Sequence, residues 1–216
     1  MARPSIYKIL ENPKVYSFVL SFLQPGMDKG FQKNIPQHLN LKAECTLDVG
    51  CGPKPVINEP NGKLVGIDVN EEYIKEFTYG HLDSDPSMDF IENTRTRFGF
   101  VGSADSLPFP DNTFNESRTV GVFHHLTDAQ VDQAAAEMKR CTKSGGTVVI
   151  LDNVWPKNAL TRPIAWLLRY LDRGEYVRTE SELSKRLEKV LGSYKTKHRF
   201  TYSYNGLEAI IFVFEV

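Results

Sequence analysis

The sequence has few cysteines, almost no net charge and no long hydrophobic run. Its three cysteines, Cys45, Cys51 and Cys141, lack the Cys-x-x-Cys spacing and the histidine partners of a zinc site, so we expect free thiols and no metal. Lysine and arginine total 26 against 27 aspartate and glutamate, which leaves a net charge of −1 and no broad attraction to nucleic acid. No stretch reaches the roughly 20 apolar residues of a membrane-spanning helix, and the first residues show no signal-peptide pattern. These absences favour a cytoplasmic protein that acts on a small molecule.

The composition is that of an ordinary globular domain. The 216 residues are 41% hydrophobic and 25% charged, enough to bury a core, and no repeat or Pro/Gly-rich linker divides the chain. We therefore expect one domain over residues 1–216, as a monomer or a homodimer. Within it, residues 1–40 are expected to form an N-terminal helical cap and residues 153–178 a helical insertion on the substrate side.

Short apolar runs alternate with helical segments along most of the chain. Strands are predicted at 45–49, 64–68, 98–102, 117–123 and 147–151, and helices at 5–10, 13–23, 29–38, 71–79, 128–141, 159–171 and 180–191. Two last strands, 196–204 and 207–216, flank an Asn-Gly turn that favours a hairpin. This order predicts an α/β doubly wound fold, a mostly parallel seven-stranded sheet with an antiparallel C-terminal hairpin. Ligands of such sheets bind where the parallel strands end.

The first two of these strand ends carry glycine and aspartate. The first reads Asp48-Val49-Gly50-Cys51-Gly52, where glycine allows a ligand closer to the backbone than a Cβ would. An ordinary turn fits the same glycines. The second ends in Asp68, whose carboxylate suits the two hydroxyls of a ribose and equally suits the cap of the next helix.

The third and fourth strand ends make the pattern more specific. They read Gly102-Ser103-Ala104-Asp105-Ser106-Leu107-Pro108-Phe109 and Val120-Gly121-Val122-Phe123-His124-His125-Leu126. With the Gly145-Gly146 turn before the fifth strand, residues 45–152 resemble the class I S-adenosylmethionine-dependent methyltransferases, in the small-molecule branch that includes quinone-biosynthesis enzymes. The resemblance implies a Rossmann-like fold, S-adenosyl-L-methionine as cofactor, and direct transfer of its methyl group to an unidentified small-molecule acceptor.

The resemblance also implies roles for single residues. Asp48 would lie near the methionine end of the cofactor, Asp68 would bind the ribose and Asp105 the adenine amine. The cofactor-binding residues implied are Asp48, Gly50, Cys51, Gly52, Asp68, Val69, Ala104, Asp105 and Phe123. His124 and His125 are the candidate catalytic residues, because histidine titrates near neutral pH and can accept a substrate proton. Orientation of the substrate, or stabilisation of the loop, would use the same pair.

One position departs from the family pattern and keeps an alternative open. A third glycine commonly stands two positions after the second, whereas this chain has Lys54 between Pro53 and Pro55. Either an altered loop holds the methionine end, or affinity for the cofactor is reduced. The alternative function is therefore a cofactor-binding or scaffold domain of the same fold without turnover. A dehydrogenase is disfavoured, because its fingerprint needs glycine where Pro55 stands.

Substrate specificity is expected from elements laid over the strand ends. These are the insertion over 153–178 and the N-terminal helices, with Tyr7, Tyr16 and Phe31. The apolar helix at 159–171 fits a lid, a core element or a peripheral membrane contact, the last because arginines accompany Trp166. A cluster of Arg169, Arg173 and Arg178 would suit an anionic substrate, or would form a solvated face.

Overall fold

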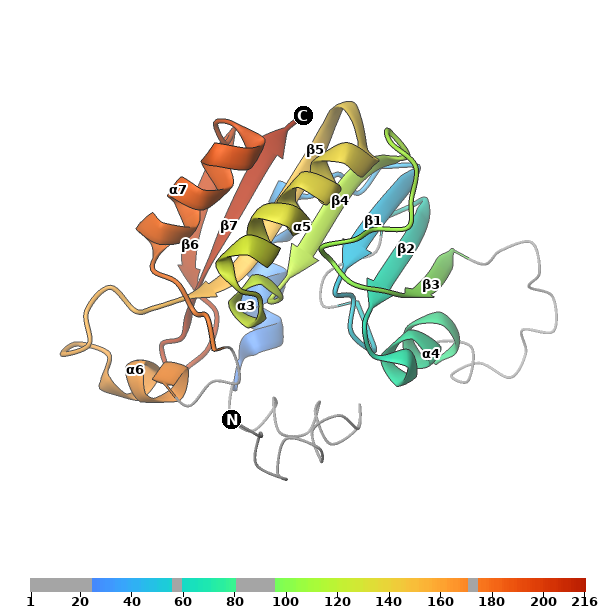
Figure 1. Ribbon diagram of the computed structural model, residues 1–216. Helices are drawn as coiled ribbons and strands as arrows, with labels where there is room; N and C mark the ends of the chain where they lie inside the picture. The colour runs from blue at the N-terminus through green and yellow to red at the C-terminus, as the bar shows by residue number, and fades with distance from the viewer. Residues whose placement is uncertain (1–24, 56–59, 81–95, 171–174) are drawn as a thin grey trace.

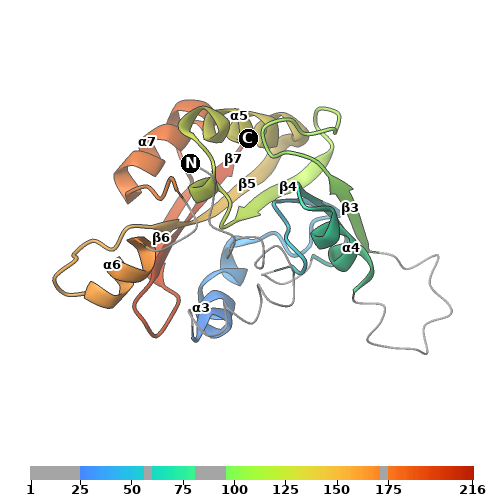
Figure 2. The same cartoon turned by 60° about the horizontal axis from the view of Figure 1, so that its bottom comes forward.

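The computed structural model describes residues 25–55, 60–80, 96–170 and 175–216 (Figure 1). Two predicted helices, 5–10 and 13–23, lie outside these ranges. So do the residues Tyr7, Tyr16 and Arg173. Within the described ranges, all the strands form a single sheet flanked by helices on both faces (Figures 1 and 2).

The sheet has seven strands in the order β3-β2-β1-β4-β5-β7-β6. Their bounds are β1 Cys45–Val49, β2 Lys63–Asp68, β3 Arg97–Val101, β4 Phe114–Val120, β5 Thr142–Val154, β6 Thr196–Thr201 and β7 Glu208–Glu215. Strands β3, β2, β1, β4 and β5 pair in parallel, and β7 pairs antiparallel with both β5 and β6. The predicted fold class is confirmed, including the antiparallel C-terminal hairpin. The strand order reverses direction between β1 and β4, which is where such sheets bind ligands.

Helices cover both faces of the sheet. They are α3 Met27–Asn34, α4 Glu71–Tyr79, α5 Asp128–Cys141, α6 Pro163–Tyr170 and α7 Glu180–Leu191, with 3₁₀ turns η1 Pro36–His38 and η2 Phe123–His125. Helices α5 and α7 pack on one face through Met138 and Leu187, and Phe31 of α3 and Ala165 of α6 pack on the other (Figure 2). The two cores meet the sheet from opposite sides because side chains alternate along each strand.

Helix α5 begins at a capping box formed by Thr127 and Gln130. The Thr127 hydroxyl accepts from the backbone N–H of Gln130 at 3.4 Å, and the Gln130 side chain accepts from the Thr127 backbone N–H at 3.1 Å. This pair satisfies two N–H groups that the first turn of the helix leaves without partners. The predicted bounds of α5 are confirmed.

Replacement of Thr127 with alanine is expected to lower the free energy of unfolding by about 1 kcal/mol, because the Gln130 N–H loses its acceptor. Urea denaturation followed by circular dichroism measures this change. Thr127→Ser keeps the hydroxyl and is the matched control, expected to stay close to the wild type. Equal losses in the two variants would contradict a role for the hydroxyl.

Strand β4 does not lie where the apolar pattern placed it. It spans Phe114–Val120, three residues earlier than predicted, and Phe123–His125 forms the turn η2 instead. The reason is that a central strand carries buried polar groups: Glu116 and Arg118 are each only 1% exposed. Glu116 accepts from the Asn40 backbone N–H at 2.8 Å and from the Thr147 hydroxyl at 3.2 Å. Hydrogen bonds from distant parts of the chain therefore allow polar residues to be buried in β4. The strand lacks the continuous apolar run by which a buried parallel strand is usually recognised in a sequence.

Helix α6 packs on the sheet by one face and leaves the other face uncovered. Ala165 and Arg169 are buried, whereas Ile164, Leu167 and Tyr170 are all more than half exposed. Among the described residues, no helix has the length and apolar character needed to cross a membrane.

Candidate functional site

Asp68 ties the ends of β1 and β2 together. Its Oδ2 accepts from the backbone N–H of Gly52 at 3.1 Å, and its Oδ1 accepts from the backbone N–H of Asn70 at 2.9 Å. Burial raises the pKa of this carboxyl group, and the hydrogen bonds from Asn70 and Gly52 oppose that rise. Each carboxylate oxygen has a second lone pair, so Asp68 can still accept hydrogen bonds from a bound hydroxyl.

The glycine loop brings its backbone close to the end of β4. Gly50 and Gly52 have φ of 69° and 62°, the left-handed region that glycine adopts without strain. A Cβ at Gly50 would lie 2.3 Å from a methyl carbon of Val122, whereas a Cβ at Gly52 would meet no atom of the described residues within 4 Å. The loop therefore has an open flank at Gly52, beside the Asp68 carboxylate. Lys54, which replaces the family's third glycine, is exposed.

The ends of β2 and β3 supply groups suited to a nucleoside. Val69 follows Asp68 and is 73% exposed, an apolar side chain at the rim of the loop. Asp105 is half-buried and accepts from the Ser103 hydroxyl at 2.5 Å, and Ala104 packs partly against the core. An open glycine backbone, two carboxylates and an apolar contact fit an adenosyl group, which presents hydroxyls, an amine and an aromatic face.

Three residues that the resemblance assigned to the cofactor are buried. Phe123 is fully buried in the core under α5, so it has no surface to offer a ligand. Cys51 is 3% exposed and packs with Phe77, which leaves only its backbone for a contact; burial raises the pKa of its thiol. Asp48 is buried against Arg118, whose Nε and Nη2 both lie 3.2 Å from Asp48 Oδ2.

The two histidines follow β4 and differ in their surroundings. His124 is 5% exposed, and its Nδ1 lies 2.5 Å from Oδ1 of Asp152, which is 2% exposed on β5. A carboxylate accepts, so Nδ1 of the neutral ring carries the proton and Nε2 holds a lone pair. That Nε2 lies 3.4 Å from the side-chain amide nitrogen of Asn153. His125 is exposed, with its ring centroid 4.1 Å from that of His124.

Asp152 was not among the residues assigned to the site from the sequence. It stands near the end of β5, the strand beside β4, and an acid at that position is the signal that points to it. Its oxygen also accepts from the Asn153 backbone N–H at 2.7 Å, which fixes the carboxylate facing the imidazole. The result is a buried histidine–carboxylate pair with the geometry of a general base and its orienting group.

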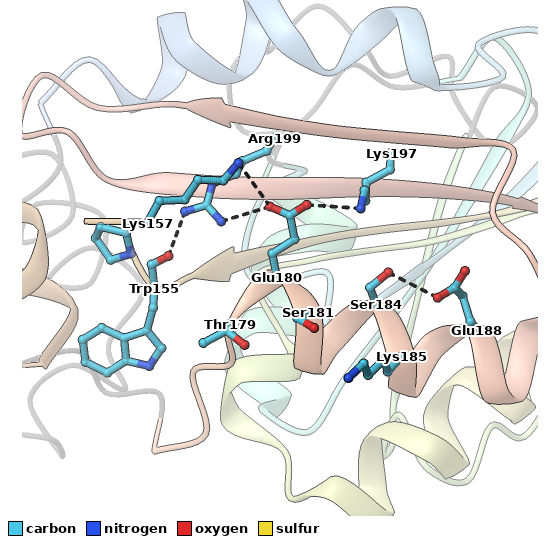
Figure 3. Close-up of a pocket in the computed structure, with 11 residues that line it drawn as sticks. Trp155, Lys157, Thr179, Glu180, Ser181, Ser184, Lys185, Glu188, Lys197 and Arg199 are labelled. Carbon is cyan, nitrogen blue, oxygen red and sulfur yellow. Dashed lines mark hydrogen bonds and ion pairs between the residues drawn. The ribbon is translucent and has the colours of Figure 1, made fainter. Parts of the chain in front are cut away.

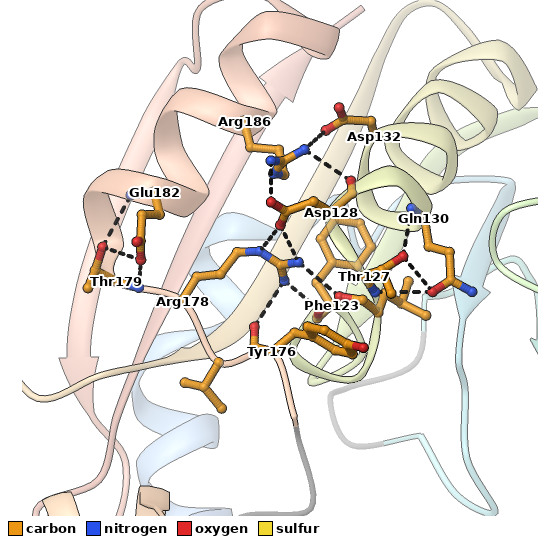
Figure 4. A network of polar contacts seen from close by, with 12 residues as sticks. Phe123, Thr127, Asp128, Gln130, Asp132, Tyr176, Arg178, Thr179, Glu182 and Arg186 are labelled. Atoms are coloured by element: carbon orange, nitrogen blue, oxygen red, sulfur yellow. Dashed lines mark hydrogen bonds and ion pairs between the residues drawn. The ribbon is translucent and has the colours of Figure 1, made fainter. Parts of the chain in front are cut away.

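The arginines expected to bind an anionic substrate are used inside the protein. Arg178 donates to Asp128 at 2.7 Å and to the backbone oxygens of Phe123 and Leu126 (Figure 4). Arg169 donates to the Tyr202 hydroxyl at 3.2 Å. Neither alternative, an anion-binding cluster or a solvated face, describes these two residues, because both are buried and donate hydrogen bonds within the fold.

Other elements expected to shape the substrate pocket have structural roles as well. Phe31 is buried with its ring centroid 5.0 Å from that of Tyr202, so it belongs to the core under α3. A groove between α7 and β6 lies at the sheet edge opposite to β3 (Figure 3). Its charges pair with each other, since Glu180 lies 3.2 Å from both Lys197 and Arg199. We assign no ligand to this groove.

The strand ends described above fall in a region that is similar to known methyltransferases. Residues 47–150 match the family of methyltransferase domains. The chain is 34% identical to an uncharacterized methyltransferase of Schizosaccharomyces pombe, over 50% of this chain and 39% of the relative. It is 33% identical to a ubiquinone/menaquinone biosynthesis C-methyltransferase of Saccharophagus degradans, over 47% of this chain and 37% of the relative. The chain thus spans less than half the length of these two curated relatives.

Solved structures show the same fold at low sequence identity. The YcgJ protein of Bacillus subtilis superimposes with a TM-score of 0.60 at 18% identity, covering 86% of this chain and 97% of that protein. A geranyl diphosphate methyltransferase, solved with geranyl diphosphate and sinefungin, gives a TM-score of 0.61 at 12% identity, covering 81% and 71%. Together, these findings show that residues 47–150, about half of the chain, are similar to methyltransferase domains and that the fold is shared with solved methyltransferase structures.

Proposed function

We propose that this chain transfers the methyl group of S-adenosylmethionine to a small-molecule acceptor that must lose a proton. One observation carries the proposal: the strand order separates two groups of functional residues, one on each side of the point between β1 and β4 where the order reverses. The carboxylates and the open glycine backbone lie at the ends of β1, β2 and β3. The His124–Asp152 pair lies at the ends of β4 and β5.

The first half suits the cofactor. Asp68 would accept hydrogen bonds from the ribose hydroxyls, Asp105 would accept from the adenine amine, and Val69 would cover the purine face. Gly52 would leave room for the ligand beside the backbone, and Asp48 would lie at the amino-acid end. When bound, the cofactor supplies a methyl group on a sulfonium, which is electrophilic without further activation. The protein then has to hold the acceptor close and in line.

The second half suits removal of the acceptor's proton. Nε2 of His124 would take the proton, and the Asp152 carboxylate would stabilise the imidazolium that results. His125 is exposed beside this pair and would contact the acceptor. A base is required when the nucleophile is a hydroxyl or an activated ring carbon, and not when it is a free amine.

The acceptor class follows from this requirement and from the relatives. One of them is named as a ubiquinone/menaquinone biosynthesis C-methyltransferase. We propose an apolar acceptor that carries a hydroxylated ring, a phenol or hydroquinone. The exposed apolar side chains of α6, which follows β5, offer a surface on which such a molecule would lie.

Incubation with tritiated-methyl S-adenosylmethionine and a fractionated cell extract tests the proposal. We expect label in the apolar small-molecule fraction, and none when Asp68→Ala replaces the wild type. Label in protein or nucleic acid would contradict the acceptor class. Binding of the cofactor without transfer to any fraction would instead support a scaffold without turnover, the alternative that Lys54 leaves open.

A further inference from the structure

A buried ion pair joins the two central strands at the switch point. Asp48 of β1 and Arg118 of β4 are directly opposite in the parallel register, and they are 3% and 1% exposed. A guanidinium group deep in a parallel sheet costs free energy unless strong partners surround it. Apolar residues would fill these positions at lower cost. The pair therefore requires an explanation beyond stability.

The contacts within the pair are one-sided. Nε and Nη2 of Arg118 both reach Oδ2 of Asp48. Within the described part of the chain, Oδ1 of Asp48 accepts no hydrogen bond. Val49 and Gly50 follow Asp48, so this oxygen stands two residues before the open glycine loop. A carboxylate held by one oxygen, with the other available at a ligand loop, is a ready acceptor for a cation.

Glu116 lies on the same strand and shows a different arrangement. It is two residues before Arg118 and therefore on the same face of β4. Its Oε2 accepts from the Asn40 backbone and from the Thr147 hydroxyl, so it joins parts of the fold away from the glycine loop. Glu116 is therefore a buried carboxylate used within the fold, whereas Asp48 lies next to the glycine loop.

We propose that Arg118 is a positioning residue for the amino-acid end of the cofactor: it fixes Asp48 through Oδ2 so that Oδ1 accepts the cofactor's α-ammonium group. This inference rests on the proposed function. Arg118 also acts through charge. Burial raises the pKa of Asp48, and the Arg118 guanidinium opposes that rise by favouring the charged carboxylate.

Two ligands that share the adenosyl group separate this role from a general structural one. S-adenosylhomocysteine carries the amino-acid end, and 5′-methylthioadenosine lacks it. Calorimetry on Arg118→Met is expected to show affinity for S-adenosylhomocysteine reduced by roughly 10- to 100-fold, with that for 5′-methylthioadenosine almost unchanged. Asp48→Asn is expected to give the same selective loss. The double variant Asp48→Asn/Arg118→Met leaves no unpaired buried charge. Its affinity for S-adenosylhomocysteine should fall no further than that of either single variant.

Glu116→Gln is the matched control, a buried carboxylate on the same strand that should keep the wild-type ratio of the two affinities. The positioning role of Arg118 would be overturned if Arg118→Met and the double variant lost affinity equally for both ligands, or lost affinity for neither. The proposed function would still stand after either result. If the wild type bound neither ligand, the proposed function would fall, and this inference with it.

Discussion

His124→Gln is expected to lower the methyl-transfer rate by about 10²- to 10⁴-fold, the contribution typical of a positioned general base. Glutamine keeps a donor for the buried Asp152 carboxylate, so the variant should fold, but it cannot accept a proton. Single-turnover assays with saturating cofactor measure the effect on the chemical step. Affinity for S-adenosylhomocysteine should stay near the wild-type value, because the assigned cofactor residues lie at the ends of β1 to β3.

Asp152→Asn tests whether the carboxylate acts through His124. An amide no longer stabilises the imidazolium that forms when His124 takes the proton, so we expect a lower rate. His125→Ala is the matched control, an exposed histidine beside the pair, and its expected loss is much smaller. A larger loss in His125→Ala than in His124→Gln would move the base to His125. If the methyl-transfer rate were unchanged in both His124→Gln and His125→Ala, neither histidine would be the base.

Asp68→Ala is expected to reduce cofactor affinity by about 100-fold or more, because each lost hydrogen bond between the charged carboxylate and a ribose hydroxyl contributes about 1.5–3 kcal/mol. The loss should be similar for S-adenosylhomocysteine and 5′-methylthioadenosine, since both carry the ribose. This distinguishes Asp68 from Arg118, whose expected effect is confined to the first ligand. Calorimetric titration of each ligand gives the two affinities directly.

The same variant removes the acceptor for the Gly52 and Asn70 N–H groups, so its fold needs a control. Asp68→Asn keeps an acceptor oxygen of similar shape and should show a smaller loss. Its thermal midpoint should also lie closer to that of the wild type. Affinity that survives Asp68→Ala unchanged would sink the ribose assignment, whereas a collapse of the thermal midpoint in both variants would show that the carboxylate is structural.

The uneven success of sequence-based prediction along this chain has a physical cause. The bounds of β1, α4, α5 and α7 follow from local features: apolar periodicity, threonine or asparagine caps, and glycine after the element. Strand β4 was misplaced because Glu116 and Arg118 interrupt its apolar run. Their burial is tolerated only because partners distant in sequence satisfy them. Local pattern cannot report such partners.

The sequence alone determined the fold class, the order of the elements and the strand ends that carry the site. Glycine at positions 50 and 52 and aspartate at 68 are signals contained in a few neighbouring residues, and the structure brings these residues together.

Only the tertiary structure decided which charges face each other. Asp152 meets His124 across 28 residues, Arg118 meets Asp48 across 70, and Arg178 meets Asp128 across 50. These pairings depend on strand register and on how helices pack. A charged side chain in the sequence gives no sign of whether the fold will neutralise it, as at Arg178, or orient it toward a ligand, as proposed for Asp48.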